Sequence, residues 1–90
     1  MSTVQVNATI INKLGLHARP AMSFVETASG CKASIMVAKG DERVDGKSIM
    51  QMMLLALRKG TTLTIEADGE DADDACVSLK ALIESGFDED

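Results

Sequence analysis

Three segments of the chain alternate apolar and polar residues with a period of two, and this alternation restricts the fold more than any other feature. The apolar members are, in chain order, Val4, Val6, Ala8 and Ile10; Ala33, Ile35 and Val37; and Leu63, Ile65 and Ala67. Such a pattern is typical of strands with one buried face and one face in water. A doubly wound parallel sheet needs strands that are apolar on both faces, so the pattern favours an antiparallel sheet covered on one side.

Two other segments place apolar residues at intervals of three and four, the spacing of a helix with one buried face. They cover residues 18–28 and 72–83, and each is followed by a glycine, Gly30 or Gly86, that can end the helix. The acidic residues around the start of the second segment would be stabilised by the positive end of the helix dipole.

Residues 48–57 are so uniformly apolar that their period does not decide between helix and strand. Ser48 followed by Gln51 resembles a capping box, and methionine and leucine favour helix, so we predict a short helix. A short strand over residues 42–45 completes the element order. The predicted fold is α+β, an open-faced sandwich: a four-stranded antiparallel sheet with three helices on one face (βαββαβα).

Size and composition exclude several classes of protein. A chain of 90 residues suffices for one domain with a modest core, and 46% hydrophobic residues is too apolar for a disordered chain. No apolar run approaches the ~20 residues of a membrane helix. The N-terminus also lacks the basic start and apolar stretch of a signal peptide. We therefore expect a cytoplasmic protein without membrane insertion.

Charge is distributed unevenly along the chain. The net charge of −5 argues against nucleic acid as a partner, because its phosphates would be repelled. Residues 1–60 carry eight Lys/Arg and four Asp/Glu, whereas residues 61–90 carry one and ten, so chemistry on an anion belongs to the first two thirds. One histidine with two distant cysteines, Cys31 and Cys76, indicates neither a disulfide framework nor a metal site, and we expect no cofactor.

His17 lies in the segment Gly15-Leu16-His17-Ala18-Arg19-Pro20-Ala21, where a loop meets a predicted helix. Pro20 belongs in the first turn, which places His17 at or beside the N-cap. The backbone N–H groups of Ala18 and Arg19 and the positive end of the dipole would then favour a neutral, nucleophilic ring and stabilise a phosphoryl group on it. The Arg19 guanidinium could grip phosphoryl oxygens through two parallel hydrogen bonds.

Geometry alone also allows His17 to be an ordinary polar residue at a helix start. The sequence has no Gly-x-x-x-x-Gly-Lys loop for a nucleotide, and no second base or paired carboxylate is evident near His17. A self-sufficient hydrolase, including one that pairs Cys31 with His17, is therefore disfavoured. The residues offer a nucleophile and an anion cradle, and a partner would have to supply the rest of the reaction.

The segment Gly15–Ala21, with Asn12-Lys13 before it, resembles the active-site signature of HPr, the histidine phosphocarrier of the phosphoenolpyruvate-dependent phosphotransferase system. The predicted element order agrees with that family over essentially the whole chain. The resemblance implies one HPr-like phosphocarrier domain over residues 1–90, expected to be a monomer. It also implies that His17 accepts a phosphoryl group at Nδ1 from phospho-Enzyme I and passes it to an Enzyme IIA-type protein. Arg19 would assist, and the protein would be a stoichiometric carrier, not an enzyme.

The segment Lys47-Ser48-Ile49-Met50 resembles the regulatory serine region of HPr proteins that are substrates of HPr kinase/phosphorylase. Many of those proteins have glycine where this chain has Gln51. Ser48 is thus a candidate for regulatory phosphorylation, and it is equally explained as the cap of a helix; the two interpretations are compatible. The alternative function is a regulatory binding module controlled by phosphorylation at Ser48 or His17.

We predict a partner-docking patch formed by Ile49, Met50 and Met53. A helix that is apolar all round cannot bury every face on a one-sided sheet, and flexible methionines suit a surface that must fit several partners. The C-terminal segment Ser85–Asp90 resembles the tail of NPr, the member of the nitrogen-related branch, whereas the Ser48 region resembles kinase-regulated HPr. The sequence leaves the sugar and nitrogen-related branches, and the identity of the acceptor, open.

Overall fold

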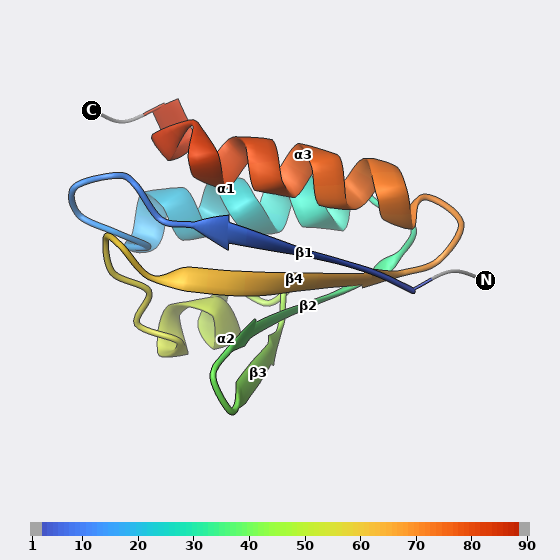
Figure 1. The fold of residues 1–90 in the computed structure, drawn as a ribbon, viewed down its shortest axis with the longest axis horizontal. Helices are drawn as coiled ribbons and strands as arrows, with labels where there is room; N and C mark the ends of the chain where they lie inside the picture. The colour runs from blue at the N-terminus through green and yellow to red at the C-terminus, as the bar shows by residue number, and fades with distance from the viewer. Residues whose placement is uncertain (1–2, 89–90) are drawn as a thin grey trace.

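The computed structural model, which describes residues 3–88, arranges four strands in one antiparallel sheet of order β1-β4-β2-β3 (Figure 1). The strands are β1 (Thr3–Thr9), β2 (Ser34–Lys39), β3 (Glu42–Asp45) and β4 (Thr62–Asp68). In the central strand β4, Ile65 lies opposite Val6 of β1 on one side and opposite Val37 of β2 on the other. This register joins the three predicted apolar alternations into one continuous apolar face.

Three helices cover this face: α1 (Ala18–Ser29), α2 (Ile49–Leu54) and α3 (Ala72–Glu84), and α3 is followed by a short 3-10 turn, η1 (Gly86–Asp88). α1 packs against both α2 and α3, and Figure 1 shows α1 and α3 lying along the sheet. On the opposite, open face, the Thr64 hydroxyl donates a hydrogen bond to Asn7 Oδ1 at 2.9 Å. The predicted open-faced α+β sandwich is confirmed.

The core is almost entirely aliphatic, as expected for a chain with only two phenylalanines among its aromatic residues. Phe24 of α1 is fully buried beneath the sheet, and Phe87 of η1 is also buried. The helical stripe of α3 faces the core through Ala72, Ala75, Cys76, Leu79 and Ile83. A fully buried leucine or isoleucine such as Leu79 or Ile83 contributes about 1.5–3 kcal/mol, so the apolar spacing of the sequence is what places the helices.

The second helix is shorter than predicted. We expected helix over residues 48–57, but α2 ends at Leu54, with Leu55 as its C-cap. Ala56 then adopts a φ of +51°, in the left-handed region that ends helices. The turn allows Leu55 and Leu57, which a continuous helix would point in different directions, both to be buried in the core.

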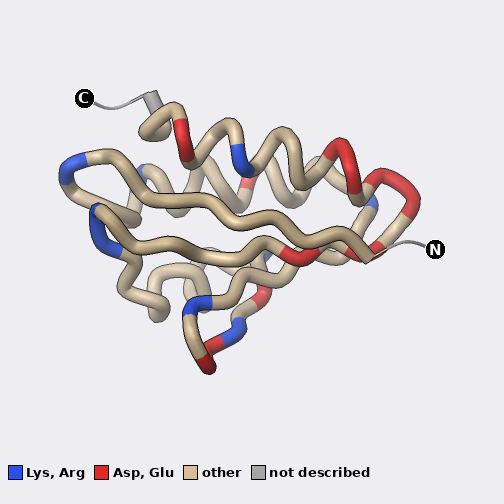
Figure 2. Tube along the Cα trace, viewed as in Figure 1, with Lys and Arg blue, Asp and Glu red and all other residues tan. Residues whose placement is uncertain are grey.

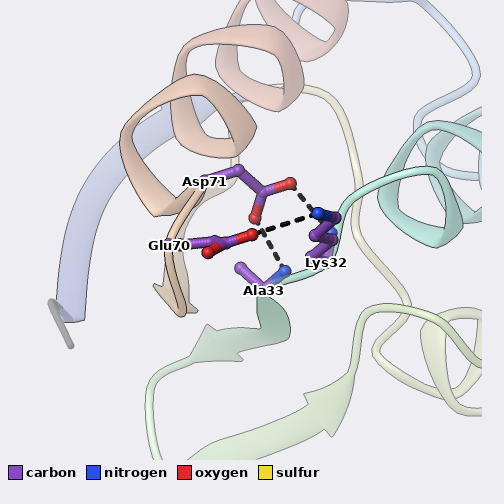
Figure 3. A network of polar contacts seen from close by, with 4 residues as sticks. All are labelled: Lys32, Ala33, Glu70 and Asp71. Atoms are coloured by element: carbon purple, nitrogen blue, oxygen red, sulfur yellow. Dashed lines mark hydrogen bonds and ion pairs between the residues drawn. The ribbon is translucent and has the colours of Figure 1, made fainter.

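A network of polar contacts joins the α1–β2 loop to the β4–α3 turn (Figure 3). The carboxylate of Asp71 accepts hydrogen bonds from the backbone N–H of Lys32 at 2.8 Å and of Ala33 at 2.7 Å. The Lys32 ammonium also forms an ion pair with Glu70 at 3.1 Å. These backbone hydrogen bonds, above all the one from Lys32, hold the pKa of Asp71 below its ordinary value. We call these four residues the clasp.

Within the described residues, no helix is long and apolar enough to cross a membrane. Of the acidic C-terminal segment that resembles the tail of NPr, Glu89 and Asp90 lie outside the described residues.

Candidate functional site

His17 is the N-cap residue of α1, as the position of Pro20 predicted. Its backbone is extended (φ −95°, ψ −169°), so the helix begins at the next residue, and its carbonyl accepts the N–H of Ala21 at 3.0 Å. The His17 side chain is partly exposed. The only histidine of the chain is therefore placed at a helix start with part of its side chain at the surface.

The first turn of α1 has few backbone donors to offer an anion. Pro20 has no N–H, and the N–H of Ala21 is already bonded to the His17 carbonyl. The N–H groups of Ala18 and Arg19 remain as the donors of this turn, at the positive end of the helix dipole. The side chain of Arg19 is exposed. The structure thus brings together the residues that the sequence predicted for an anion cradle.

The loop before His17 is held by two hydrogen bonds. The N–H of Leu16 donates to the carbonyl of Leu57 at 2.8 Å, and the side-chain amide of the buried Asn12 donates to the carbonyl of Gly15 at 2.7 Å. Gly15 has a φ of +68°, and a Cβ at this position would lie 2.5 Å from the Leu57 oxygen. Only glycine allows this close approach, so the backbone leading to His17 is fixed against the segment that follows α2.

Sequence reasoning missed this segment. Residues 55–61 run beside the His17 loop: Gly60 N–H bonds to Ile10 O at 2.8 Å, and Ile10 N–H bonds to Thr61 O at 2.9 Å. A Cβ on Gly15 would also meet the Cα of Arg58 at 2.9 Å. No local sequence pattern predicts a contact between two segments that lie some forty positions apart in the chain. We call residues 10–17 and 55–61 together the site end of the molecule.

Ser48 is the N-cap of α2, and its Oγ accepts the backbone N–H of Gln51 at 3.2 Å, which confirms the capping interpretation. The side chain of Gln51 departs from the capping box, because its Oε1 accepts from the N–H of Asp45 at 2.9 Å instead of from Ser48. The Asp45 carboxylate in turn accepts the N–H of Lys47 at 2.9 Å. Ser48 is partly exposed at this closed turn, and its phosphorylation stays a prediction.

The predicted docking residues lie at the surface to different degrees. Met50 is 78% exposed and Met53 45%, while Met52 between them is buried in the core. Leu54, which the prediction omitted, is 75% exposed, and Ile49 is only partly exposed. A hollow of about 310 Å³ next to this patch is lined by Met22, Val25, Glu26 and Ile49. The exposed apolar surface that the prediction required is present, and its use in docking stays a prediction.

Neither cysteine offers a nucleophile. Cys31 is half-buried, Cys76 is buried, and both thiols are free. Burial is the main cause that raises the pKa of each thiol, so both stay protonated near neutral pH. Among the residues that the structure describes, no three His, Cys, Asp or Glu side chains are placed to hold a metal ion.

The family model described as the PTS HPr component phosphorylation site matches residues 4–85. The chain belongs to this family. It is 51% identical over 80 residues to the phosphocarrier protein HPr of Neisseria meningitidis (serogroup A), which covers 89% of this chain and 90% of the relative. It is also 36% identical to the phosphocarrier protein NPr of Shewanella violacea, over 99% of this chain and 98% of the relative. Both HPr and NPr are thus among its relatives.

Solved structures agree with the HPr fold. The structure of HPr from Thermoanaerobacter tengcongensis has a TM-score of 0.89 and 43% identity, covering 100% of this chain and 99% of that chain. A dimer of HPr from the same organism also matches, with a TM-score of 0.77 and 45% identity over 93% of this chain and 97% of that one. Since a relative forms a dimer, the monomeric state expected for this chain stays a prediction.

Proposed function

We propose that this member of the HPr family carries a phosphoryl group on His17. The group originates from phosphoenolpyruvate, is accepted from phospho-Enzyme I, and is passed to an Enzyme IIA protein of a sugar or nitrogen-related phosphotransferase system in the cytoplasm. The observation that carries the proposal is the partly exposed His17 at the N-cap of α1, inside the segment matched by the family model.

The chain needs only three features for each transfer. The lone pair of His17 Nδ1 forms a bond to phosphorus while the bond from phosphorus to the donor breaks, and the donor keeps that electron pair. The N–H groups of Ala18 and Arg19 and the Arg19 guanidinium hold the phosphoryl oxygens through charge-assisted hydrogen bonds. The second transfer reverses these roles, so the protein leaves the cycle unchanged and acts as a stoichiometric carrier without a cofactor.

The partners supply the remaining groups by docking beside His17. Ile49, Met50 and Met53 are proposed as the apolar docking patch, because exposed methionines can repack against a donor and an acceptor in turn. Exposed apolar side chains of this size on one short helix are typical of interaction sites.

The proposal is tested by incubating the protein with phosphoenolpyruvate and Enzyme I and measuring acid-labile, alkali-stable phosphate. His17→Ala should abolish this phosphate and Ser48→Ala should leave it unchanged, with circular dichroism showing that both variants are folded. Arg19→Ala should slow the reaction by about a hundred- to a thousandfold, the range for loss of one oxyanion-hole donor. Phosphate that persisted in the His17→Ala variant would refute the proposal.

A second candidate, a regulatory module switched by phosphorylation, is favoured by one observation: Ser48 is partly exposed at a helix N-cap. A phosphate at this position would add negative charge directly beside the docking patch. If ATP and HPr kinase/phosphorylase labelled Ser48 while Enzyme I left His17 unlabelled, the module would replace the carrier as the conclusion.

A further inference from the structure

The cations of this chain fall into two groups. Three form ion pairs with carboxylates: Lys32 with Glu70, Arg43 with Glu66, and Lys80 with Glu84. Two others donate to backbone carbonyls, Lys39 to Leu55 and Lys47 to Cys31. The remaining four are exposed and form no ion pair within residues 3–88, and they are Lys13, Arg19, Arg58 and Lys59. All four lie in the site end or in the first turn of α1.

No acidic residue accompanies these four cations in the sequence. Residues 10–25 and 52–65 contain no Asp or Glu, although the whole chain has a net charge of −5. Figure 2 shows the consequence: the loops at one end of the molecule carry only basic positions, while acidic positions gather where β4 leads into α3. The molecule therefore has a positive pole at the site end and a negative pole at the other, a distribution that steers an oppositely charged surface towards the positive pole.

Arg58 belongs to the segment after α2 whose backbone contacts the His17 loop. Its neighbour Leu57 accepts the Leu16 N–H at 2.8 Å, and its own Cα lies 2.9 Å from where a Cβ of Gly15 would be. It also follows closely on the exposed end of α2, at Leu54. The backbone of Arg58 thus lies against the loop that leads to the residue that would carry phosphate, and along the chain it follows the exposed end of α2.

We infer that Arg58 is a partner-recognition residue: its guanidinium pairs with a carboxylate on an acidic protein surface that surrounds the apolar contact at α2. This inference rests on the proposed function and names the chemistry of the surface that both donor and acceptor present to the site. Arg58 affects how tightly the protein binds its partner. The bond changes at phosphorus remain the work of His17 and Arg19.

The test compares Arg58→Ala with Arg43→Ala, since both remove one arginine and change the net charge equally. Arg43 is the matched control because its guanidinium already forms an ion pair with Glu66 at 2.8 Å. The rate of phosphorylation by Enzyme I and phosphoenolpyruvate is measured against carrier concentration. Arg58→Ala should raise KM about two- to fivefold, the range for one exposed ion pair, with kcat unchanged. Arg43→Ala should leave KM unchanged, and Arg58→Lys should restore most of the affinity.

Two further readouts separate recognition from chemistry. The KM difference should shrink in about 0.5 M salt, where charges at the surface are screened beyond a few ångströms. In the purified phosphorylated protein without Enzyme I, phospho-His17 should hydrolyse at the same rate in Arg58→Ala and in wild type. A changed hydrolysis rate or a changed kcat would show that Arg58 contacts the phosphoryl group, and would overturn the inference. Equal KM values for the two alanine variants would also overturn it while leaving the carrier function standing. A wild-type protein that took no phosphate from Enzyme I would instead refute the function itself.

Discussion

The clasp and the site end lie at opposite ends of the sheet, and their charged side chains differ in whether they find partners within the chain. In the clasp, Asp71 accepts two backbone N–H groups and Lys32 pairs with Glu70, so these groups find partners within the chain. At the site end, Arg58 is exposed without an ion pair in the described part of the chain, and Ala56 holds a left-handed backbone conformation.

This difference separates residues that stabilise the fold from residues that are available to bind a partner. A hydrogen bond or ion pair that is completed inside the chain away from His17 acts on the folding equilibrium alone. An exposed cation or apolar side chain contributes little to folding, and strained backbone costs stability, so their presence together is explained by contacts made with another molecule. Changes at the clasp should therefore alter stability alone, whereas changes at the site end should alter phosphorylation as well.

The largest expected effects come from replacing one glycine at each end with alanine. At the clasp, a Cβ on Gly69 would lie 2.7 Å from the Cα of Ala33; at the site end, a Cβ on Gly15 would lie 2.5 Å from the Leu57 oxygen. Both glycines also have positive φ. Gly69→Ala and Gly15→Ala should each lower the free energy of unfolding by about 1–3 kcal/mol, measured by urea denaturation.

Only Gly15→Ala should also slow phosphorylation by Enzyme I. Moving Leu57 away releases the Leu16 N–H and displaces His17, and a displacement of about 1 Å can cost up to a hundredfold in rate. Gly40→Ala is the control for backbone strain alone, because Gly40 has a φ of +58° with no atom near its Cβ position. If folded Gly15→Ala and folded Gly69→Ala were phosphorylated by Enzyme I at the same rate, the proposed difference between the clasp and the site end would be wrong.

A smaller effect, confined to stability, is expected from Asp71→Asn. The lowered pKa of Asp71 means that its ionised form is favoured in the folded state, mainly through the Lys32 N–H. This stabilisation is fully present above the unfolded pKa of about 3.9 and is lost as the pH falls through the lower folded value. Asp71→Asn should lower the urea midpoint at pH 7, and its difference from wild type should narrow below about pH 4.

Asp74→Asn is the matched control, because Asp74 is exposed in the first turn of α3 and the variant has the same change in charge. Its urea midpoint at pH 7 should stay closer to wild type than that of Asp71→Asn. Phosphorylation of His17 should be unaffected in both variants. A loss of phosphorylation in folded Asp71→Asn would show that the clasp is coupled to the site end.

The parts of this structure that the sequence predicted are those encoded by neighbours in the chain. Period-two alternation defined the strands, and Pro20 placed His17 at the start of α1 within a single turn. The predicted order of elements was correct for the same reason, since each strand or helix carries its own buried face.

The parts that the sequence did not predict depend on contacts between distant residues. Asp71 was expected to complement the dipole of α3, but its carboxylate binds the loop at Lys32, thirty-nine positions earlier. The end of α2 was placed at Leu57 because no glycine or proline marks the turn. The nearness of Arg58 to the His17 loop follows from the pairing of the two segments and has no local signal.

The smallest expected effect concerns Ala56, the residue that ended α2 earlier than predicted. An alanine at a φ of +51° costs about 1–2 kcal/mol relative to the right-handed region. Ala56→Gly should relieve most of this strain while adding chain entropy to the unfolded state, for a net gain of about 0.5 kcal/mol in the free energy of unfolding. Urea denaturation measures the difference.

Ala81→Gly gives the opposite expectation for the same chemical change. Ala81 is exposed inside α3, where glycine costs roughly 1 kcal/mol. If Ala56→Gly lost stability as Ala81→Gly does, the left-handed turn after α2 would not be strained. If Ala56→Gly were more stable and were phosphorylated at the wild-type rate, the strained backbone at Ala56 would not be needed to hold Leu57 in place. A gain in stability with slower phosphorylation would show that the rigid alanine helps to hold the Leu57 carbonyl against the His17 loop.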